Sequence, residues 1–102
     1  MKYRFLKPAE EELREAVAYY DEQKSGLGDE LLNEVDAVIA RILQFPEAHP
    51  LVASAIRRIR TKRFPYSLLY KHYNGEIVIV AVMHGRRKPD YWKDRINDGG
   101  GG

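Results

Sequence analysis

The sequence has no cysteine, and none of its apolar runs is long enough to span a membrane. Without cysteine, a disulfide framework, a thiolate nucleophile and a thiolate zinc site are all excluded. The first residues also lack the charged and apolar regions of a signal peptide, so we expect a cytoplasmic protein with no membrane role. Neither a glycine-rich phosphate loop nor a serine-nucleophile motif occurs, and no cofactor is expected.

The composition is that of an ordinary globular protein, with 44% hydrophobic and 31% charged residues among 102. This length supports one hydrophobic core rather than two. The four closing glycines offer no side chain to pack. We therefore predict a single domain over residues 1–97 and a flexible tail over 98–102.

Charge is divided unequally between the two halves of the chain. Residues 1–50 hold six Lys/Arg against eleven Asp/Glu, a net charge of −5, whereas residues 51–102 hold eleven against four, a net of +7. The cations of the second half gather in residues 57–63 and 86–88. Such clustering favours contact with phosphates or with an acidic protein partner, although charges that only aid solubility remain the alternative.

The first half has the pattern of one strand followed by two helices. A strand is predicted over Tyr3–Leu6, and Pro8 suits the first turn of a helix that continues to Gln23 with one apolar face. Gly26 or Gly28 can adopt a positive φ in the linker. Asp29 is then the expected N-cap of a second amphipathic helix that ends at residues 45–46. So short a linker predicts an antiparallel helical hairpin.

The second half predicts a sheet. Three strands are expected, over residues 55–63, 66–73 and 76–83, with Asn74-Gly75 as the hairpin turn between the last two. Residues 77–82 are apolar on both faces and should lie in the middle of the sheet, and residues 88–97 are expected to form a short helix. The predicted fold class is α+β, in the order β-α-α-β-β-β, with the helical hairpin packed on a small, mostly antiparallel sheet.

The first predicted strand of the sheet carries a row of cations. Alternate residues of a strand share a face, so Arg58, Arg60 and Lys62 should lie together. Arg63 and Arg87 complete the set expected to bind RNA or a partner. Protection of a sheet edge against aggregation is the structural alternative.

The segment after the last strand contains the candidates for catalysis. His84 titrates near neutral pH, Arg86 and Arg87 can hold a phosphate, and Tyr91 can donate a proton or stack on a base. Structural alternatives exist for both ends of this segment: His84 can be structural, and Tyr91-Trp92 can be an aromatic plug of the core. The other two histidines are isolated, so no metal site is expected.

These motifs occur in an order that resembles a known family. The residues concerned are Tyr19-Tyr20, Gln23, Gly26-Leu27-Gly28, Arg63-Phe64-Pro65-Tyr66, Tyr70, Ala81-Val82-Met83-His84, Arg86, Arg87, Pro89, Tyr91, Trp92 and Arg95. In this order they look like the RelE/ParE superfamily of type II toxin–antitoxin toxins, over nearly all of residues 1–97. The resemblance implies a growth-inhibiting, plasmid-stabilising toxin that a cognate antitoxin neutralises in a hetero-oligomer.

The resemblance leaves two targets open. RelE-like members cut mRNA on the ribosome, and as a metal-independent endoribonuclease this chain would use His84, Tyr91 and Arg86 for proton transfer and charge stabilisation. ParE-like members inhibit DNA gyrase without known nuclease chemistry. Pro65 is expected to interrupt the strand ladder, which favours the second reading. The candidate catalytic residues favour mRNA cleavage, which is therefore the function we expect, with gyrase inhibition as the alternative.

Overall fold

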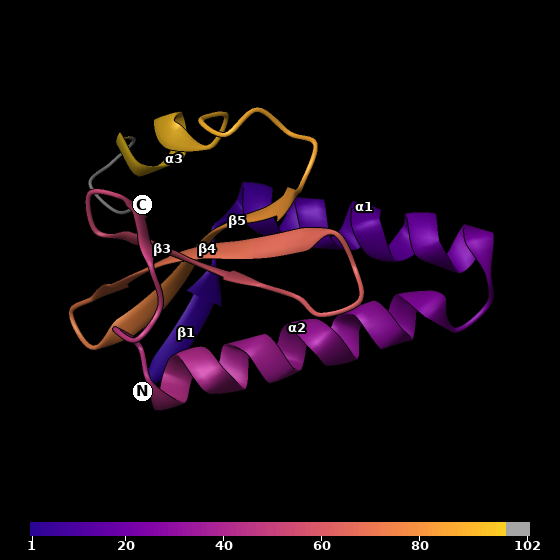
Figure 1. The fold of residues 1–102 in the computed structure, drawn as a ribbon, viewed down its shortest axis with the longest axis horizontal. Helices are drawn as coiled ribbons and strands as arrows, with labels where there is room; N and C mark the ends of the chain where they lie inside the picture. The colour runs from indigo at the N-terminus through magenta and orange to yellow at the C-terminus, as the bar shows by residue number, and fades with distance from the viewer. Residues whose placement is uncertain (98–102) are drawn as a thin grey trace.

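The computed structural model describes residues 1–97 as one sheet with a helical hairpin (Figure 1). The predicted tail over 98–102 lies outside the described residues. The elements are β1 (Lys2–Phe5), α1 (Lys7–Gln23), α2 (Leu27–Gln44), β2 (Leu51–Ala53), β3 (Ile56–Arg60), β4 (Tyr66–Tyr73), β5 (Glu76–His84) and α3 (Lys93–Asn97). The predicted α+β order is confirmed, with β2 as an additional short strand.

The sheet has the strand order β1-β5-β4-β3-β2, in which β1 lies parallel to β5 and the remaining pairs are antiparallel. The β4–β5 hairpin turns at Asn74-Gly75, where both residues have positive φ, as predicted. Strand β5 lies between β1 and β4, and residues 77–83 are buried. The sheet is therefore covered on both faces along this strand.

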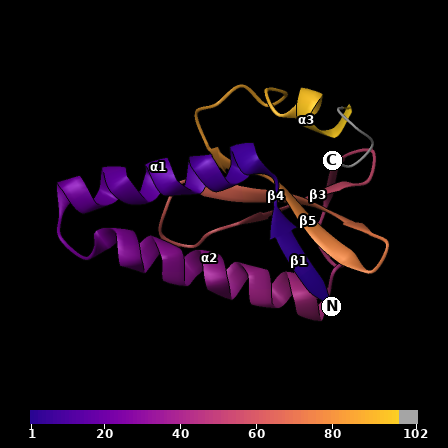
Figure 2. The same cartoon turned by 180° about the vertical axis from the view of Figure 1, so that it is seen from behind.

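The two helices run back alongside each other on one face of the sheet (Figures 1 and 2). Helix α2 is preceded by Gly26, whose φ of 90° places it in the left-handed region that glycine enters most easily. The predicted N-cap at Asp29 is therefore wrong, because the helix already begins at Leu27 and Asp29 lies in its first turn. The negative charge of Asp29 still favours that end of the helix dipole.

Gly28 marks the close approach of the two helices. A Cβ atom at this position would lie 2.7 Å from the carbonyl oxygen of Val17 and 2.7 Å from Oδ1 of Asp21. Its own N–H donates to Asp21 Oδ1 at 2.8 Å. Glycine is thus required here by space rather than by backbone conformation.

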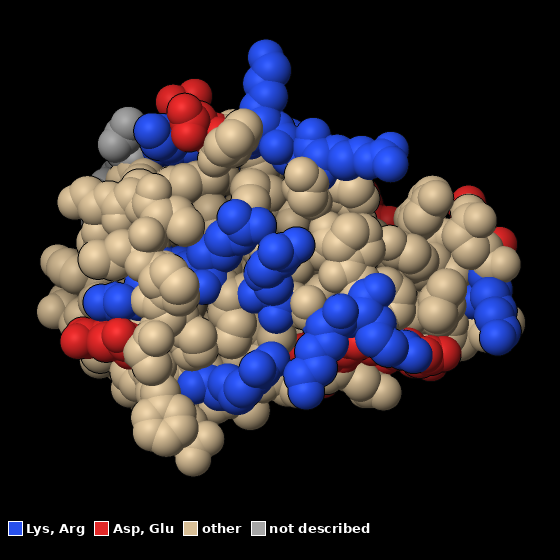
Figure 3. Space-filling model, in the orientation of Figure 1, with Lys and Arg blue, Asp and Glu red and all other residues tan. Residues whose placement is uncertain are grey.

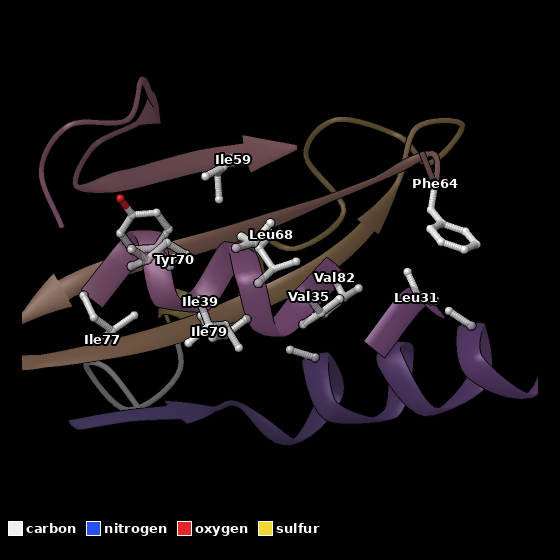
Figure 4. Close-up of a cluster of buried hydrophobic side chains, with 14 residues drawn as sticks. Leu31, Val35, Ile39, Ile59, Phe64, Leu68, Tyr70, Ile77, Ile79 and Val82 are labelled. Atoms are coloured by element: carbon white, nitrogen blue, oxygen red, sulfur yellow. The ribbon is translucent and has the colours of Figure 1, made fainter. Parts of the chain in front are cut away.

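The main core fills the layer between the hairpin and the sheet (Figure 4). Helix α2 contributes a stripe at helical spacing, and β4 and β5 contribute alternate residues that point toward it. The labelled members are Leu31, Val35, Ile39, Ile59, Phe64, Leu68, Tyr70, Ile77, Ile79 and Val82. The hairpin could not bury its apolar face alone, and the sheet supplies the missing surface.

A second, smaller core covers the opposite face of the sheet. Its buried members are Ile56, Leu69, Val80, Ala81, Met83 and Trp92. Trp92 is only 2% exposed and comes from the segment that leads into α3. For Trp92, the aromatic plug is therefore the correct reading.

The strand predicted over residues 55–63 is shorter than expected. Ala55 has a φ of 62° and separates β2 from β3, which begins at Ile56 and ends at Arg60. Thr61 then turns the chain, because its hydroxyl donates to the carbonyl oxygen of Phe64 at 2.6 Å. None of the helices within residues 1–97 is both long and apolar enough to cross a bilayer.

Candidate functional site

An open cavity of about 610 Å³ lies between α1 and the loop that follows β5. Its walls come from three parts of the chain that are distant in sequence: one face of α1, the start of β4, and the end of β5 with its loop. The lining residues are Glu12, Glu15, Ala16, Tyr19, Tyr20, Pro65, Tyr66, Val82, His84, Gly85, Arg86, Arg87 and Tyr91. The three predicted catalytic residues therefore line one cavity.

The carboxylate of Glu12, at one wall of this cavity, accepts hydrogen bonds from β5 and from the C-terminal segment. Arg95 binds it through both terminal nitrogens, with Nη1–Oε1 and Nη2–Oε2 distances of 2.9 Å. The hydroxyl of Tyr91 donates to Oε2 at 2.6 Å, and the backbone N–H of Val82 donates to Oε1 at 3.0 Å. Arg95 also donates to the carbonyl oxygen of Val80 at 3.1 Å. One side chain of α1 thus holds β5 and the C-terminal segment.

This arrangement shifts the pKa of each partner. Burial alone would raise the pKa of Glu12, but the hydrogen bonds from Arg95, Tyr91 and the Val82 amide outweigh it and keep the pKa below its usual value. Burial, followed by the hydrogen bond to Glu12, raises the pKa of Tyr91 well above that of a free phenol. Tyr91 is therefore a neutral donor near pH 7.

The ring of Tyr91 also contacts two arginines. The guanidinium carbon of Arg87 lies 4.0 Å from the ring centroid, and that of Arg95 lies 4.9 Å from it. Both distances are within the range of cation–π contacts. Tyr91 therefore positions Arg87 at the cavity while its hydroxyl remains on Glu12.

His84 ends β5 and packs edge-on against Tyr66, with ring centroids 5.1 Å apart. Its Nδ1 lies 3.0 Å from the backbone nitrogen of Arg86, and this N–H can donate only to an unprotonated Nδ1. The neutral ring therefore carries its proton on Nε2. In this geometry Nδ1 of His84 accepts the Arg86 amide, and Nε2 is the nitrogen left to donate.

The turn before β4 supports the same loop. The N–H of Gly85 donates to the carbonyl oxygen of Pro65 at 2.8 Å. Pro65 itself lies between β3 and β4. The expectation that Pro65 interrupts the strand ladder is therefore wrong, because β3 ends at Arg60 and β4 begins only at Tyr66.

Arg58 and Arg60 of β3 lie on the face of the sheet opposite the helices, whereas Arg57 pairs with Tyr70 of the main core and lies on the helix face. Register pairs Arg58 with Leu69 and Arg60 with Ser67, and Leu69 belongs to the smaller core on that face. Arg58 donates from Nε to Ser67 Oγ at 3.0 Å. Figure 3 shows several Lys and Arg side chains gathered over the middle of the viewed face. Arg58 and Arg60 therefore share a face, as predicted.

Lys62 and Arg63 differ from that prediction because they lie in the turn after β3. Their backbone N–H groups donate to Glu34 Oε1 at 2.9 and 3.1 Å, which anchors the turn to α2. The guanidinium of Arg63 pairs with Glu34 at 3.2 Å and also with Glu30. Lys62 is thus not on the strand face that carries Arg60, and the charge of Arg63 is already compensated.

Sequence reasoning missed several cavity residues. Glu12 had a detectable signal: it falls at helical spacing between Ala9 and Ala16, so it is a charged residue on the apolar face of α1. Tyr66 and Arg95 belong to the motifs that carry the family resemblance, but only the fold brings Tyr66 to the cavity and Arg95 to Glu12. Within residues 1–97, no three His, Asp or Glu side chains are grouped so as to hold a metal ion.

Comparison with known proteins identifies the family. Residues 3–89 match the family described as ParE toxin of type II toxin-antitoxin system, parDE. The chain is 37% identical over 82 residues to Toxin ParE2 from two Mycobacterium tuberculosis strains, CDC 1551 / Oshkosh and ATCC 25618 / H37Rv, which covers 79% of this chain and 78% of each relative.

The fold is also similar to a solved structure titled Chromosomal ParDE TA system from P. aeruginosa. The TM-score is 0.61 with 16% identity, over 82% of this chain and 95% of that chain. This likeness supports the fold, and the sequence matches support the family. The chain therefore belongs to the ParE toxin family of type II toxin–antitoxin systems.

Proposed function

We propose that this ParE-family toxin inhibits growth by binding DNA gyrase, without cleaving RNA, and that a cognate antitoxin neutralises it. Membership of the ParE family supports this choice of target, because the ParE-like side of the superfamily is the side that inhibits gyrase. The partner follows from the type II class of the matched family. The cationic face that carries Arg58 and Arg60 is the surface we assign to the target, since clustered cations favour contact with an acidic surface.

The observation that carries this proposal is that both nominated proton-transfer groups are already engaged in hydrogen bonds within the chain. RNA cleavage by the 2′-hydroxyl needs a group that accepts its proton. His84 has Nδ1 occupied by the Arg86 amide and its proton on Nε2, and Tyr91 donates to Glu12 with a raised pKa. His84 would have to release the Arg86 amide before Nδ1 could accept a proton, and Tyr91 would have to release Glu12.

A supercoiling assay on the purified protein and its variants tests this proposal. The protein should block DNA supercoiling by gyrase in vitro, and His84→Ala should block it about as well, because no proton transfer is involved. Lys24→Ala, an exposed change outside the cavity, is the matched control. Failure of the wild-type protein to affect supercoiling would overturn the proposal.

mRNA cleavage is the second candidate function. One observation favours it. Tyr66 of β4 pairs with His84, and the next residue of β4, Ser67, pairs with Arg60. The uncompensated charge of Arg60 therefore lies at the same end of the sheet as His84. If this function holds, expression should produce discrete mRNA cuts in primer extension. His84→Ala and Arg86→Ala should then abolish the cuts while supercoiling remains unaffected by the wild-type protein.

A further inference from the structure

The cavity between α1 and the loop after β5 has walls of opposite charge. On the α1 side Glu12 is neutralised by Arg95, whereas Glu15 has no hydrogen bond or ion pair within residues 1–97. On the loop side lie Arg86 and Arg87. A ligand that fills the cavity therefore meets a carboxylate on one wall and cations on the other.

Between these walls the cavity is aromatic. Tyr19 and Tyr20 meet edge to face with ring centroids 5.1 Å apart, and Tyr20 and Tyr66 do so at 6.4 Å. Tyr19 is 55% exposed, so its ring remains open to a ligand. Aromatic faces of this kind stack on planar heterocycles with little preference among them.

The cationic wall is suited to one anionic group. His84 lines the cavity, and Nε2 is its ring nitrogen left to donate, because Nδ1 is already bound by the Arg86 amide. The Arg86 side chain makes no hydrogen bond or ion pair with any described residue. A guanidinium and an imidazole N–H together bind a phosphate well.

We propose that this cavity binds a free nucleoside monophosphate. The base packs against the tyrosines, the phosphate meets Arg86 and His84, and the ribose hydroxyls donate to Glu15. The volume of about 610 Å³ lies within the range typical of small-ligand sites. This site is separate from the face with Arg58 and Arg60 that we assign to gyrase, so it does not rest on the gyrase proposal.

The charge distribution favours a free nucleotide over a nucleic-acid strand. Within a strand, each nucleoside is flanked by a phosphate on both sides, so a binding groove carries cations along its length. Here the cations lie on the loop wall alone, and the opposite wall carries Glu15. A second phosphate at that wall would be repelled.

Calorimetric titration of the purified chain tests the site. We expect AMP to bind roughly tenfold or more tightly than either adenosine or inorganic phosphate, because only AMP engages both halves of the site. Arg86→Ala should weaken AMP binding by about tenfold. Lys24→Ala removes one exposed cation outside the cavity and should leave binding unchanged.

Amide chemical shifts locate the ligand. AMP should shift the resonances of Tyr66, Gly85 and Arg86 in the wild-type protein, a result that needs no variant to fold. The proposal would be overturned if AMP bound no more tightly than phosphate, or if Arg86→Ala and Lys24→Ala lost AMP affinity equally. Tighter binding of a hexanucleotide than of AMP would also overturn it, since the site would then belong to a strand. Supercoiling inhibition is measured separately, so either proposal can fail alone.

Discussion

The hydroxyl of Tyr91 donates a 2.6 Å hydrogen bond to Oε2 of Glu12, which joins the C-terminal segment to the first turns of α1. Arg95 binds the same carboxylate with both terminal nitrogens. These contacts close the second core over Trp92 and fix one wall of the cavity. Glu12 is therefore the residue on which the site and the stability of the fold depend together.

Glu12→Gln should lower the free energy of unfolding by about 2–4 kcal/mol, because it leaves Arg95 as a partly buried charge without its partner. The side chains of the pair are only 15% and 17% exposed. Urea unfolding measures the change. Glu10→Gln removes an exposed pair with Arg14 and should cost less than about 0.5 kcal/mol. Equal losses of unfolding free energy in Glu12→Gln and Glu10→Gln would contradict the stabilising role of the Glu12–Arg95 pair.

Tyr91→Phe should lower the free energy of unfolding by about 1–2 kcal/mol, since it removes one hydrogen bond to a charged acceptor and keeps the ring. The stacking of Arg87 on that ring should persist. Under the gyrase proposal, supercoiling inhibition should therefore stay close to wild type. A complete loss of inhibition in a variant that still folds would show that the hydroxyl acts on the target.

The lowered pKa of Glu12 predicts a defined pH dependence. At a pH between the lowered pKa of Glu12 in the folded chain and its ordinary pKa near 4.5, the unfolded chain binds more protons than the folded one. The stability from Glu12 is thus fully present above about pH 5.5 and is lost as pH falls through the folded pKa. Urea unfolding across this range measures the difference in free energy of unfolding between wild type and Glu12→Gln. This difference should be constant at neutral pH and should shrink below pH 4.5. A difference that grows on acidification would contradict the assignment.

The fold was largely predictable because its signals are local. Helical periodicity, Asn74-Gly75 and the apolar run of β5 each specify an element without reference to the rest of the chain. The end of β3 was not predictable, because the turn depends on the hydroxyl of Thr61 reaching Phe64. A strand pattern continues through Lys62 in the sequence and gives no sign of that hydrogen bond.

The site was predictable only in part. His84, Arg86 and Tyr91 lie close in sequence and all reach the cavity. Their chemistry, however, depends on contacts between distant residues. Burial raises the pKa of Tyr91 most, and the hydrogen bond to Glu12, which is 79 positions away, raises it further, so the sequence suggested a proton donor where the structure holds a fixed hydrogen bond.

Gly28→Ala should lower the free energy of unfolding by about 1–3 kcal/mol, because the new methyl group would overlap the Val17 carbonyl and force α1 and α2 apart. Thermal or urea unfolding measures the loss. Gly85→Ala is the matched control: its Cβ would lie 3.7 Å from the Pro65 carbonyl oxygen, an ordinary contact. A change within about 0.5 kcal/mol is expected there. Similar losses at both positions would show that helix contact is not the cause.

Arg60 and Arg63 should contribute unequally to the target, although both are exposed arginines from one cluster in the sequence. Arg63 is held by Glu30 and Glu34, so its charge is largely cancelled before any partner arrives. Arg60 has no such pair within residues 1–97. Arg60→Ala should therefore raise the concentration needed for half-maximal gyrase inhibition by roughly three- to tenfold and weaken its dependence on salt, whereas Arg63→Ala should change it less than about twofold. The opposite ranking would place the contact on the turn beside α2 rather than on the sheet face.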